Sequence, residues 1–261
     1  MSASFAYNRA IVRRPGKSVV KGLRAGGGED PSLEGILAEH AAYVAALRNA
    51  GLAVTELEPL EDFPDAIFVE DPALVFPNGA VLLNPGTPSR VGEGAFLRPA
   101  LEAAFERVLT LPEGHADGGD VLAMGRDIYI GLSGRTDRAG AEALVRLLAE
   151  LGLAAQVAET PPQVLHRKTG CTQLDEETLL LLPELAGHPL FAGYRRIEVP
   201  DGERGGSNVL RLADRVLASK RFPRLLDRLD AEGYPVVALD TAEIAKIDAG
   251  LTCMSLRWRA A

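Results

Sequence analysis

The sequence predicts a mixed α/β fold, and three observations support this prediction. Segments with the roughly 3.6-residue periodicity of amphipathic helices alternate with paired apolar runs joined by turn residues, which are typical of β-hairpins. The hairpins recur about every 40 to 55 residues, a spacing found in repeat architectures. The chain has 261 residues, of which 47% are hydrophobic and 25% charged, so it can bury a core as one large domain or two modest ones. This pattern fits either a closed ring of α/β units or a two-layer α/β sandwich with unrelated hairpins.

Three segments show clear helical periodicity, and a fourth shows it more weakly. In chain order the predicted helices span residues 32–50, 95–106 (the weaker one), 136–151 and 224–232. Thr136 is a suitable N-cap for the third helix, because its hydroxyl can accept a hydrogen bond from a backbone N–H of the first turn. Glycine follows the three clear helices at Gly51, Gly152 and Gly233, where helices commonly end.

Four predicted hairpins lie between these helices. They span residues 66–84, 120–132, 174–182 and 209–219, with turns at Pro77-Asn78-Gly79, Gly125-Arg126-Asp127, Asp175-Glu176-Glu177 and Ala213-Asp214. The two ends of the chain supply a fifth unit, because a strand at 251–258 can pair beside a short strand at 10–12. Five hairpin-plus-helix units suggest the closed ring without excluding the sandwich.

The chain is acidic. Its 28 Lys and Arg residues against 36 Asp and Glu residues give a formal net charge of -8. This balance argues against nucleic-acid partners and anionic membrane surfaces, which bind positive patches, and favours a cationic small molecule. The N-terminus lacks a basic start followed by an apolar run, and charged residues interrupt every apolar stretch before about 18 residues. We therefore expect a cytoplasmic protein.

The two cysteines, Cys171 and Cys253, are too few for a disulfide framework, and the chain has no Cys-x-x-Cys pair to hold zinc. One of them is therefore a candidate reactive thiol. Alternation along the predicted last strand places Met254, Leu256 and Trp258 on the apolar face and Cys253 on the opposite face. A free cysteine is also commonly a small buried apolar residue, which is the interpretation that we keep for Cys171.

A nucleophilic cysteine needs an acid–base partner, and histidine is the usual one. Of the four histidines, His40 lies in the first predicted helix and His188 in a turn of surface type. His166 stands just before a hairpin, at a strand start like the candidate cysteine. His115 precedes a glycine-rich turn in which Asp117 can orient an imidazole. The residues alone leave both His115 and His166 as candidates.

Segment 63–72 combines three carboxylates with an apolar, strand-like run. Asp65, Glu70 and Asp71 are costly to bury unless a cation meets them. The segment therefore predicts either a cation-binding site or an edge strand whose acids are solvated. Metal binding has little support, because no histidine ligand pattern accompanies these carboxylates.

Five short motifs follow one another along the chain. They are Phe63-Pro64-Asp65 with Glu70-Asp71-Pro72, Asp117-Gly118-Gly119-Asp120, Gly131-Leu132-Ser133-Gly134-Arg135-Thr136, Leu165-His166-Arg167-Lys168, and Lys246-Ile247-Asp248 with Leu251-Thr252-Cys253-Met254-Ser255. In type, order and total length this set resembles the dimethylarginine dimethylaminohydrolase family of the guanidine-modifying superfamily. The resemblance implies a five-bladed pseudosymmetric α/β propeller that forms one catalytic domain over residues 1–261, with no cofactor and no metal.

The resemblance also implies catalytic roles, position by position. Cys253 matches the nucleophile, His166 the general acid/base, and Asp117 the carboxylate that orients the histidine. Some relatives have glutamate where Asp117 stands. The implied substrate-binding residues are Asp65, Glu70 and Asp71 around the guanidinium, Arg90 and Arg135 at the amino-acid end, and Leu23 and Ile247 through a lid loop and backbone contacts. The glycine-rich segment 25–30 matches the lid itself.

The implied activity is hydrolysis of Nω-methylated arginine to citrulline and dimethylamine or methylamine, through a covalent cysteine thiouronium intermediate. The partner is thus a small cationic amino acid, with no nucleic acid and no membrane, and the resemblance is compatible with a homodimer. Two alternatives remain. An arginine deiminase or other guanidine hydrolase uses the same residues, although deiminases of the resembling type usually carry an added helical region. A non-catalytic propeller binding protein shares the general fold.

Overall fold

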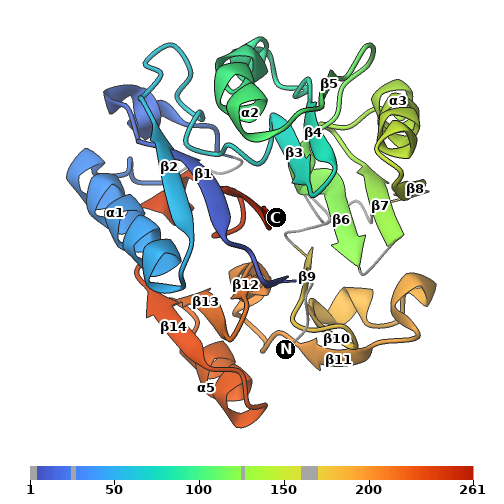
Figure 1. Ribbon diagram of the computed structural model, residues 1–261. Helices are drawn as coiled ribbons and strands as arrows, with labels where there is room; N and C mark the ends of the chain where they lie inside the picture. The colour runs from blue at the N-terminus through green and yellow to red at the C-terminus, as the bar shows by residue number, and fades with distance from the viewer. Residues whose placement is uncertain (1–4, 25–27, 125–126, 160–169, 261) are drawn as a thin grey trace.

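Each repeated unit folds into one small sheet of three strands. The computed structural model describes residues 5–24, 28–124, 127–159 and 170–260, and these residues form five such sheets arranged around a centre (Figure 1). In spatial order the sheets are β15 (Leu256–Trp258), β1 (Arg9–Arg13) and β2 (Ala53–Leu57); β3 (Ala73–Phe76), β4 (Gly79–Leu82) and β5 (Val108–Thr110); β6 (Val121–Met124), β7 (Asp127–Leu132) and β8 (Ala154–Glu159); β9 (Cys171–Gln173), β10 (Thr178–Leu181) and β11 (Arg195–Glu198); and β12 (Leu210–Leu212), β13 (Arg215–Ser219) and β14 (Val236–Leu239).

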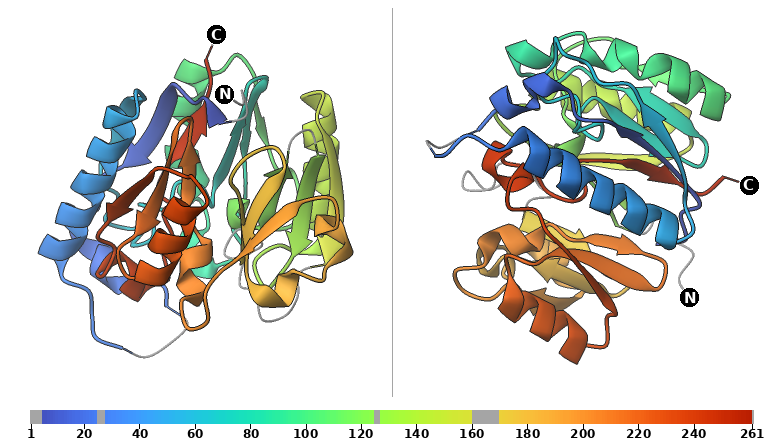
Figure 2. Two further views of the ribbon diagram at one scale, coloured as in Figure 1. Left: turned by 90° about the horizontal axis from the view of Figure 1, so that it is seen from below. Right: turned by 90° about the vertical axis from the view of Figure 1, so that its left-hand side faces the viewer.

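Every sheet has the same pairing pattern. Its first two strands run antiparallel, and its second and third run parallel. A parallel pair requires a crossover connection, which a helix usually provides. The crossover helices are α1 (Leu33–Asn49), α2 (Arg98–Ala104), α3 (Arg138–Glu150) and α5 (Pro223–Ala231). Figure 2 shows α1 and α3 on opposite outer sides of the molecule, with the sheets between them.

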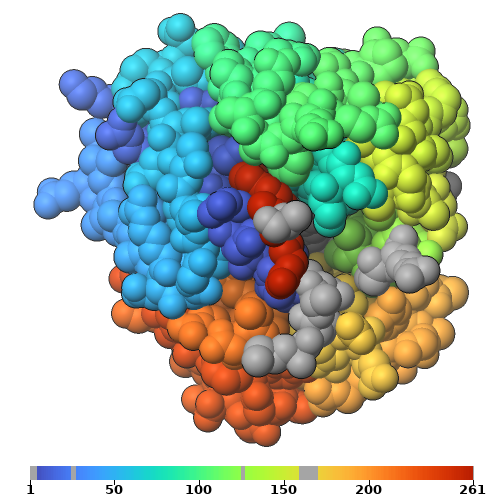
Figure 3. Space-filling view, in the orientation of Figure 1, coloured from blue at the N-terminus to red at the C-terminus, as the bar shows by residue number. Residues whose placement is uncertain are grey.

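The first and last strands close the ring. β1 pairs with β15 antiparallel, with Ala10 opposite Arg257 and Ile11 opposite Leu256. The described segments that contain β1 and β15 accordingly lie side by side near the middle of one face (Figure 3). This pairing, across almost the whole length of the sequence, confirms the five-bladed α/β propeller. The two-layer sandwich is wrong, because the five sheets surround one centre.

The helix predictions are correct in position and wrong in some details. Ser32 caps α1 by accepting a hydrogen bond from the Gly35 N–H at 3.2 Å, and Gly51 follows this helix with φ 88°. The cap of α3 is Asp137 rather than Thr136, since the Asp137 carboxylate accepts from the Gly140 N–H at 2.7 Å. The weaker predicted helix shortens to α2 and is preceded by a 3-10 turn, Glu93–Phe96. Between β10 and β11, where the periodicity predicts no helix, the crossover contains two 3-10 turns, Pro183–Leu185 and Pro189–Phe191.

The hydrophobic core lies between the sheets and the helices that cover them. In the third unit, for example, Leu144 and Leu148 of α3 are fully buried against Val121 and Ile130 of the sheet. Burial of a leucine side chain contributes about 1.5 to 3 kcal/mol, so such contacts hold each helix on its sheet. None of the described helices is long and apolar enough to cross a membrane.

Two predicted strands are shorter than expected. Residues 66–72 form successive turns and the strand begins only at Ala73, while residues 251–254 are also turns and β15 begins at Leu256. Cys253 therefore does not lie on a strand, and the alternation used to orient it does not apply. These two turn segments directly precede β3 and β15. Their polar backbone and side-chain groups form the candidate site.

Candidate active site

Cys253 lies in the turn that leads into β15. Its N–H donates to the Gly250 carbonyl at 3.3 Å, and its carbonyl accepts the N–H of Glu70 at 3.1 Å. Asn208 fixes this turn through two hydrogen bonds to Thr252. Its side-chain amide donates to the Thr252 hydroxyl and accepts the Thr252 N–H, each at 3.1 Å. Gly250 permits this clamp, because a Cβ at that position would lie 2.3 Å from the Asn208 side chain. The candidate nucleophile is thus fixed against the acidic segment.

The three acids of the 63–72 segment are buried, so the interpretation as an edge strand with solvated acids is wrong. Asp65, Glu70 and Asp71 are 3%, 5% and 6% exposed. Glu70 forms an ion pair with Arg257 at 3.3 Å. Asp65 accepts the Leu23 N–H at 2.9 Å. Burial raises the pKa of Asp65, and this effect is opposed by that N–H and by the charge on Arg90.

Arg90 is buried beside these acids and neutralises part of their negative charge. It is 1% exposed, forms an ion pair with Asp71, and donates to both Glu93 oxygens at 2.7 and 2.8 Å. It also donates to the carbonyls of Asp65 and Phe68 at 3.1 and 3.0 Å. Burial opposes the charged form, but the two acids together hold the pKa of Arg90 well above its ordinary value. We call Arg90, Asp71 and Glu93 the Arg90 cluster.

Glu93 was not among the sequence-predicted site residues. Its place in the Arg90 cluster arises because 3-10 turns on either side of Gly92 bring it back to Arg90 three positions earlier. The sequence indicates this contact only by placing an acid, Glu93, three positions after Arg90. A pair of charged residues at this spacing is usually exposed, so it does not by itself predict a buried cluster. Direct binding of substrate by Arg90 stays a prediction.

Asp117, like the three acids, is buried, and its side chain is fully enclosed. Its carboxylate accepts the Gly119 N–H at 2.9 Å and lies 3.9 Å from the Arg135 guanidinium. Its loop reaches the acidic segment through the Gly118 N–H, which donates to the Asp71 carbonyl at 2.9 Å. Glycine is required at position 118, since a Cβ there would lie 2.0 Å from the Glu70 carbonyl oxygen. This close approach brings Asp117 and the three acids into one site.

A hydroxyl network positions the turn that carries Arg135. Asp120 accepts hydrogen bonds from the hydroxyls of Ser133 and Thr136, both at 2.6 Å. The Ser133 hydroxyl accepts the Arg135 N–H at 2.9 Å, and the Thr136 hydroxyl accepts the Asp117 N–H at 3.0 Å. We call residues 133–136 the Arg135 turn. Asp120, Ser133 and Thr136 occur in the sequence motifs, but their supporting role depends on contacts that only the fold creates.

The remaining predicted contacts fall into two groups. Leu23 contacts Asp65 through its N–H, and Ile247 lies beside the preceding residue, Gly22, where an added Cβ would be 3.2 Å from Ile247 Cγ2. His166, and residues 25–27 of the predicted lid, lie outside the described residues. Their predicted roles stay predictions.

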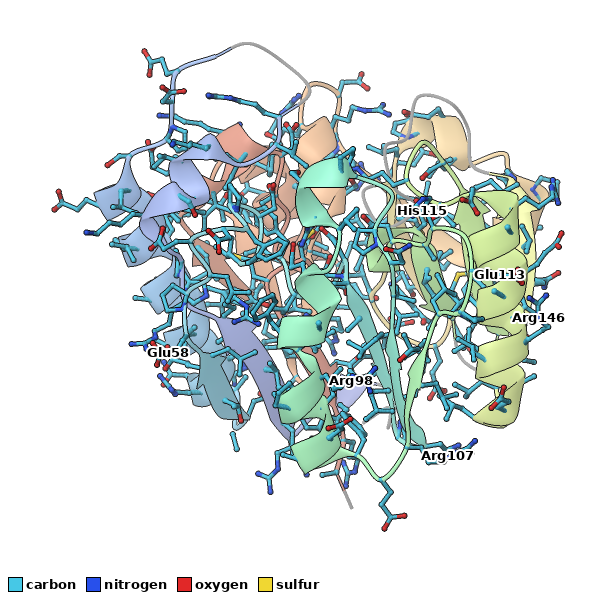
Figure 4. All side chains as sticks on the ribbon, turned by 90° about the horizontal axis from the view of Figure 1, so that it is seen from above. Glu58, Arg98, Arg107, Glu113, His115 and Arg146 are labelled. Carbon is cyan, nitrogen blue, oxygen red and sulfur yellow. The ribbon has the colours of Figure 1, made fainter. Side chains whose placement is uncertain are left out.

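His115 has a structural environment. Its ring nitrogen Nδ1 lies 3.1 Å from the Asn84 side-chain nitrogen, its N–H donates to Asp137 at 3.1 Å, and its carbonyl accepts the Asp137 N–H at 3.1 Å. It lies in the loop beside α3 (Figure 4). These contacts tie the loop to the N-terminal end of that helix.

The electrostatics of the site disfavour a free thiolate. Burial, followed by the negative charges of Asp71 and Glu70, raises the pKa of Cys253 to about 12. The thiol is therefore protonated near neutral pH. A cation bound among these acids removes part of the unfavourable potential, so the same charges that suppress the thiolate also attract a guanidinium.

A five-bladed α/β ring with a cysteine fixed against buried acids defines a guanidine-modifying class of protein. Consistent with this, the arginine deiminase family model matches residues 59–198. The chain is 34% identical over 254 residues to the N(G),N(G)-dimethylarginine dimethylaminohydrolase of Pseudomonas aeruginosa, covering 97% of this chain and 100% of that protein. It is 36% identical over 254 residues to the protein of the same name from Streptomyces coelicolor, with 96% and 97% coverage.

A solved structure shows the same relationship in three dimensions. The Pseudomonas aeruginosa protein, as a cysteine-to-serine mutant complexed with citrulline, aligns with a TM-score of 0.93 over 97% of this chain and 100% of that chain, at 34% identity. The chain belongs to the dimethylarginine dimethylaminohydrolase family. The family resemblance inferred from the five motifs is confirmed.

Proposed function

We propose that this protein hydrolyses Nω-methylated arginine to citrulline and dimethylamine or methylamine. The observation that carries the proposal is the direct hydrogen bond between the Cys253 turn and Glu70, which fixes the thiol against the buried acids. A guanidinium is a planar cation with several N–H donors, and carboxylates bind it through charge-assisted hydrogen bonds. Asp65, Glu70 and Asp71 are the proposed acids of this pocket.

The other end of the substrate carries a carboxylate, for which an arginine is the suitable partner. Arg135 is the better placed of the two predicted arginines, because its side chain is 21% exposed and its contact to Asp117 is long, at 3.9 Å. Arg90 is assigned to the same end, but most of its donors already serve the Arg90 cluster. We therefore expect Arg135 to leave Asp117 and bind the substrate carboxylate. We expect Arg90 to influence substrate binding indirectly, by positioning Asp71.

The proposed reaction has two steps. The Cys253 thiolate attacks the guanidinium carbon, a C–S bond forms, and the C–N bond to the methylated nitrogen breaks as His166 protonates the departing amine. Water deprotonated by His166 then attacks the same carbon, and the C–S bond breaks to release citrulline and the thiol. Asp117 is the proposed carboxylate that orients His166.

A citrulline assay on arginine, monomethylarginine and dimethylarginine tests this function. The methylated substrates should be converted, and Cys253→Ser should lower turnover by about a thousandfold or more, as expected for loss of a nucleophile. Cys171→Ser is the matched control and should retain activity, since Cys171 lies in a different buried cluster. Full turnover by Cys253→Ser would contradict the proposed mechanism.

Unmethylated arginine is the second candidate substrate, because the arginine deiminase family model matches residues 59–198. The same assay separates the two: a higher kcat/KM for arginine than for its methylated forms would favour a deiminase. Conversion of neither would contradict both candidates.

We also propose that residues 1–261 act as one catalytic domain in the cytoplasm. The pairing of the first and last strands supports a single unit, and the acidic composition suits a cation-binding protein without nucleic-acid or membrane partners. A homodimer is proposed from the family resemblance. Light scattering on the purified chain tests it, and a monomer mass at micromolar concentration would contradict it.

A further inference from the structure

A cavity lies in the middle of the ring. It has a volume of about 180 Å³, and its walls include residues from β3, β6, β9, β12 and β15, one strand of each of the five sheets. Tyr7 and Glu70 also border it. Cys253, Asp65, Asp71 and Asp117 are not among the residues that line it. The cavity is therefore distinct from the proposed guanidinium pocket, with Glu70 as the residue common to both.

The charged groups around this cavity leave an excess positive charge. Arg211 and Arg257 are the cations among the lining residues, and Glu70 is the anion. Glu70 is paired with Arg257 at 3.3 Å. Arg211 therefore has no acid partner in the cavity wall, while Asp175 and Asp214, which do not line the cavity, favour its charged form from outside. The lining residues alone carry one excess positive charge, which suits an anionic ligand.

Both arginines also have buried nitrogens that make no hydrogen bond within the described part of the chain. In Arg211 these are Nε and Nη1, while Nη2 donates to the Ala213 carbonyl at 2.9 Å. In Arg257, whose side chain is 10% exposed, the nitrogen is Nε. Buried donors without an acceptor are costly, so these three nitrogens are candidate donors to the oxygen of a bound ligand. The guanidinium of Arg211 lies 5.6 Å from the ring centroid of Tyr234, which restricts its orientation.

The rest of the wall is largely apolar and suits a short aliphatic body. Val75, Leu122, Val209 and Leu210 are among the lining residues. We propose that this central cavity binds a small aliphatic monocarboxylate, with its carboxylate on Arg211 and Arg257 and its chain against these apolar residues. The site combines two features that favour carboxylate recognition, buried arginine donors and an apolar wall.

Fluorine NMR on the full chain tests the proposal directly, with 4,4,4-trifluorobutyrate as the probe. We expect saturable broadening of the probe signal, reversed by butyrate and not by the neutral isostere butyramide. Arg211→Gln should weaken probe binding at least about tenfold, as expected for loss of hydrogen bonds from a charged group. Arg138→Gln is the matched control and should leave binding unchanged, because Arg138 is exposed, pairs with Glu142 and does not border the cavity.

Two further variants separate the cavity from the active site and from misfolding. Arg135→Gln should bind the probe like the wild type, because Arg135 does not border the cavity. Ala123→Phe should block binding by volume alone, since Ala123 lines the cavity and is exposed enough to accept a larger side chain. Circular dichroism confirms that each variant is folded.

The proposal is overturned if folded Ala123→Phe binds the probe like the wild type, or if Arg135→Gln rather than Arg211→Gln abolishes binding. It is also overturned if butyramide competes as well as butyrate. Equal competition by chloride would identify a site for small inorganic anions and would overturn the assignment to carboxylates.

Discussion

The Arg90 cluster and the Arg135 turn differ in how their charges are balanced. Arg90 is almost completely enclosed and meets two acids and two carbonyls, whereas Arg135 is partly exposed and meets Asp117 only at 3.9 Å. A buried arginine with these partners stabilises the charges of neighbouring acids, and removing it leaves them uncompensated. An exposed arginine with a long contact is available to a ligand at little cost. The sequence gives no reason to distinguish these two arginines. We expect Arg90 to affect mainly the stability of the protein and Arg135 to affect mainly its affinity for substrate.

The largest expected effect is that of Arg90→Gln. It leaves Asp71 and Glu93 buried without their cation, so we expect the free energy of unfolding to fall by about 3 to 5 kcal/mol. Denaturant unfolding followed by circular dichroism measures this change. Arg90→Lys is the control and should recover part of the loss, because it keeps the charge but not the fork of donors. A loss below about 1 kcal/mol in Arg90→Gln would remove the proposed contrast with Arg135.

Arg135→Gln should mainly affect substrate binding. Loss of a hydrogen bond to a charged group costs about 1.5 to 3 kcal/mol, so KM for the methylated substrate should rise about 10- to 100-fold. The free energy of unfolding should change by less than about 1 kcal/mol. Steady-state kinetics and denaturant unfolding together measure the split. Arg138→Gln, at an exposed position with a 3.9 Å contact to Glu142, should change neither quantity. An unchanged KM in Arg135→Gln would contradict the assigned role.

Thr136→Val tests whether the Arg135 turn depends on its hydroxyl network. The change removes the donor to Asp120 and the acceptor of the Asp117 N–H, and we expect a loss of about 1 to 3 kcal/mol in stability. KM should rise as well if the turn loses its position. Thr110→Val is the control. It removes only an exposed contact to Arg98 and should change neither the stability nor KM appreciably. Equal effects of the two substitutions would show that the network does not position Arg135.

The smallest expected effect concerns the thiol. The raised pKa of Cys253, about 12, keeps it protonated at pH 9, and a bound alkylguanidinium should lower this pKa because it offsets Asp71 and Glu70. A fall of one unit corresponds to about 1.4 kcal/mol. The thiolate absorbance in the ultraviolet should then increase on adding propylguanidinium at pH 11, where a fall of one unit raises the thiolate fraction from about a tenth to about a half. Cys253→Ser should abolish the increase and Cys171→Ser should retain it. No increase in the wild type would show that the acids do not control this thiol.

Local features of the sequence predicted the elements well. The crossover helices and hairpins were identified because apolar periodicity and turn residues act over a few positions. The errors occurred where a distant partner overrides local preference. Residues 66–72 look like a strand, but the Phe68 carbonyl accepts from Arg90, which lies 22 positions later, and the chain forms turns instead. Thr136 is a good cap by type, yet its hydroxyl is committed to Asp120.

The candidate site was predicted in its residue types but not in its arrangement. Asp65, Glu70, Asp71, Asp117 and Cys253 were all singled out, and the fold brings their segments together through backbone contacts such as Glu70 to Cys253 and Gly118 to Asp71. Glu93, Asp120 and Arg257 were not assigned a role, since an isolated charged residue near a motif is usually a surface group. Their importance depends on burial, which has no local signature.

The sequence by itself determined the repeated α/β units and, through five short motifs, the family and the candidate site residues, because these depend on amino-acid type and on short-range spacing. The tertiary structure alone decided that Arg90 and Arg135 differ in burial and in partners, that the three acids are buried, and that Arg211 and Arg257 line a cavity in the middle of the ring. The physical reason is that desolvation and charge pairing depend on groups from distant segments, which meet only after the first and last strands close the ring.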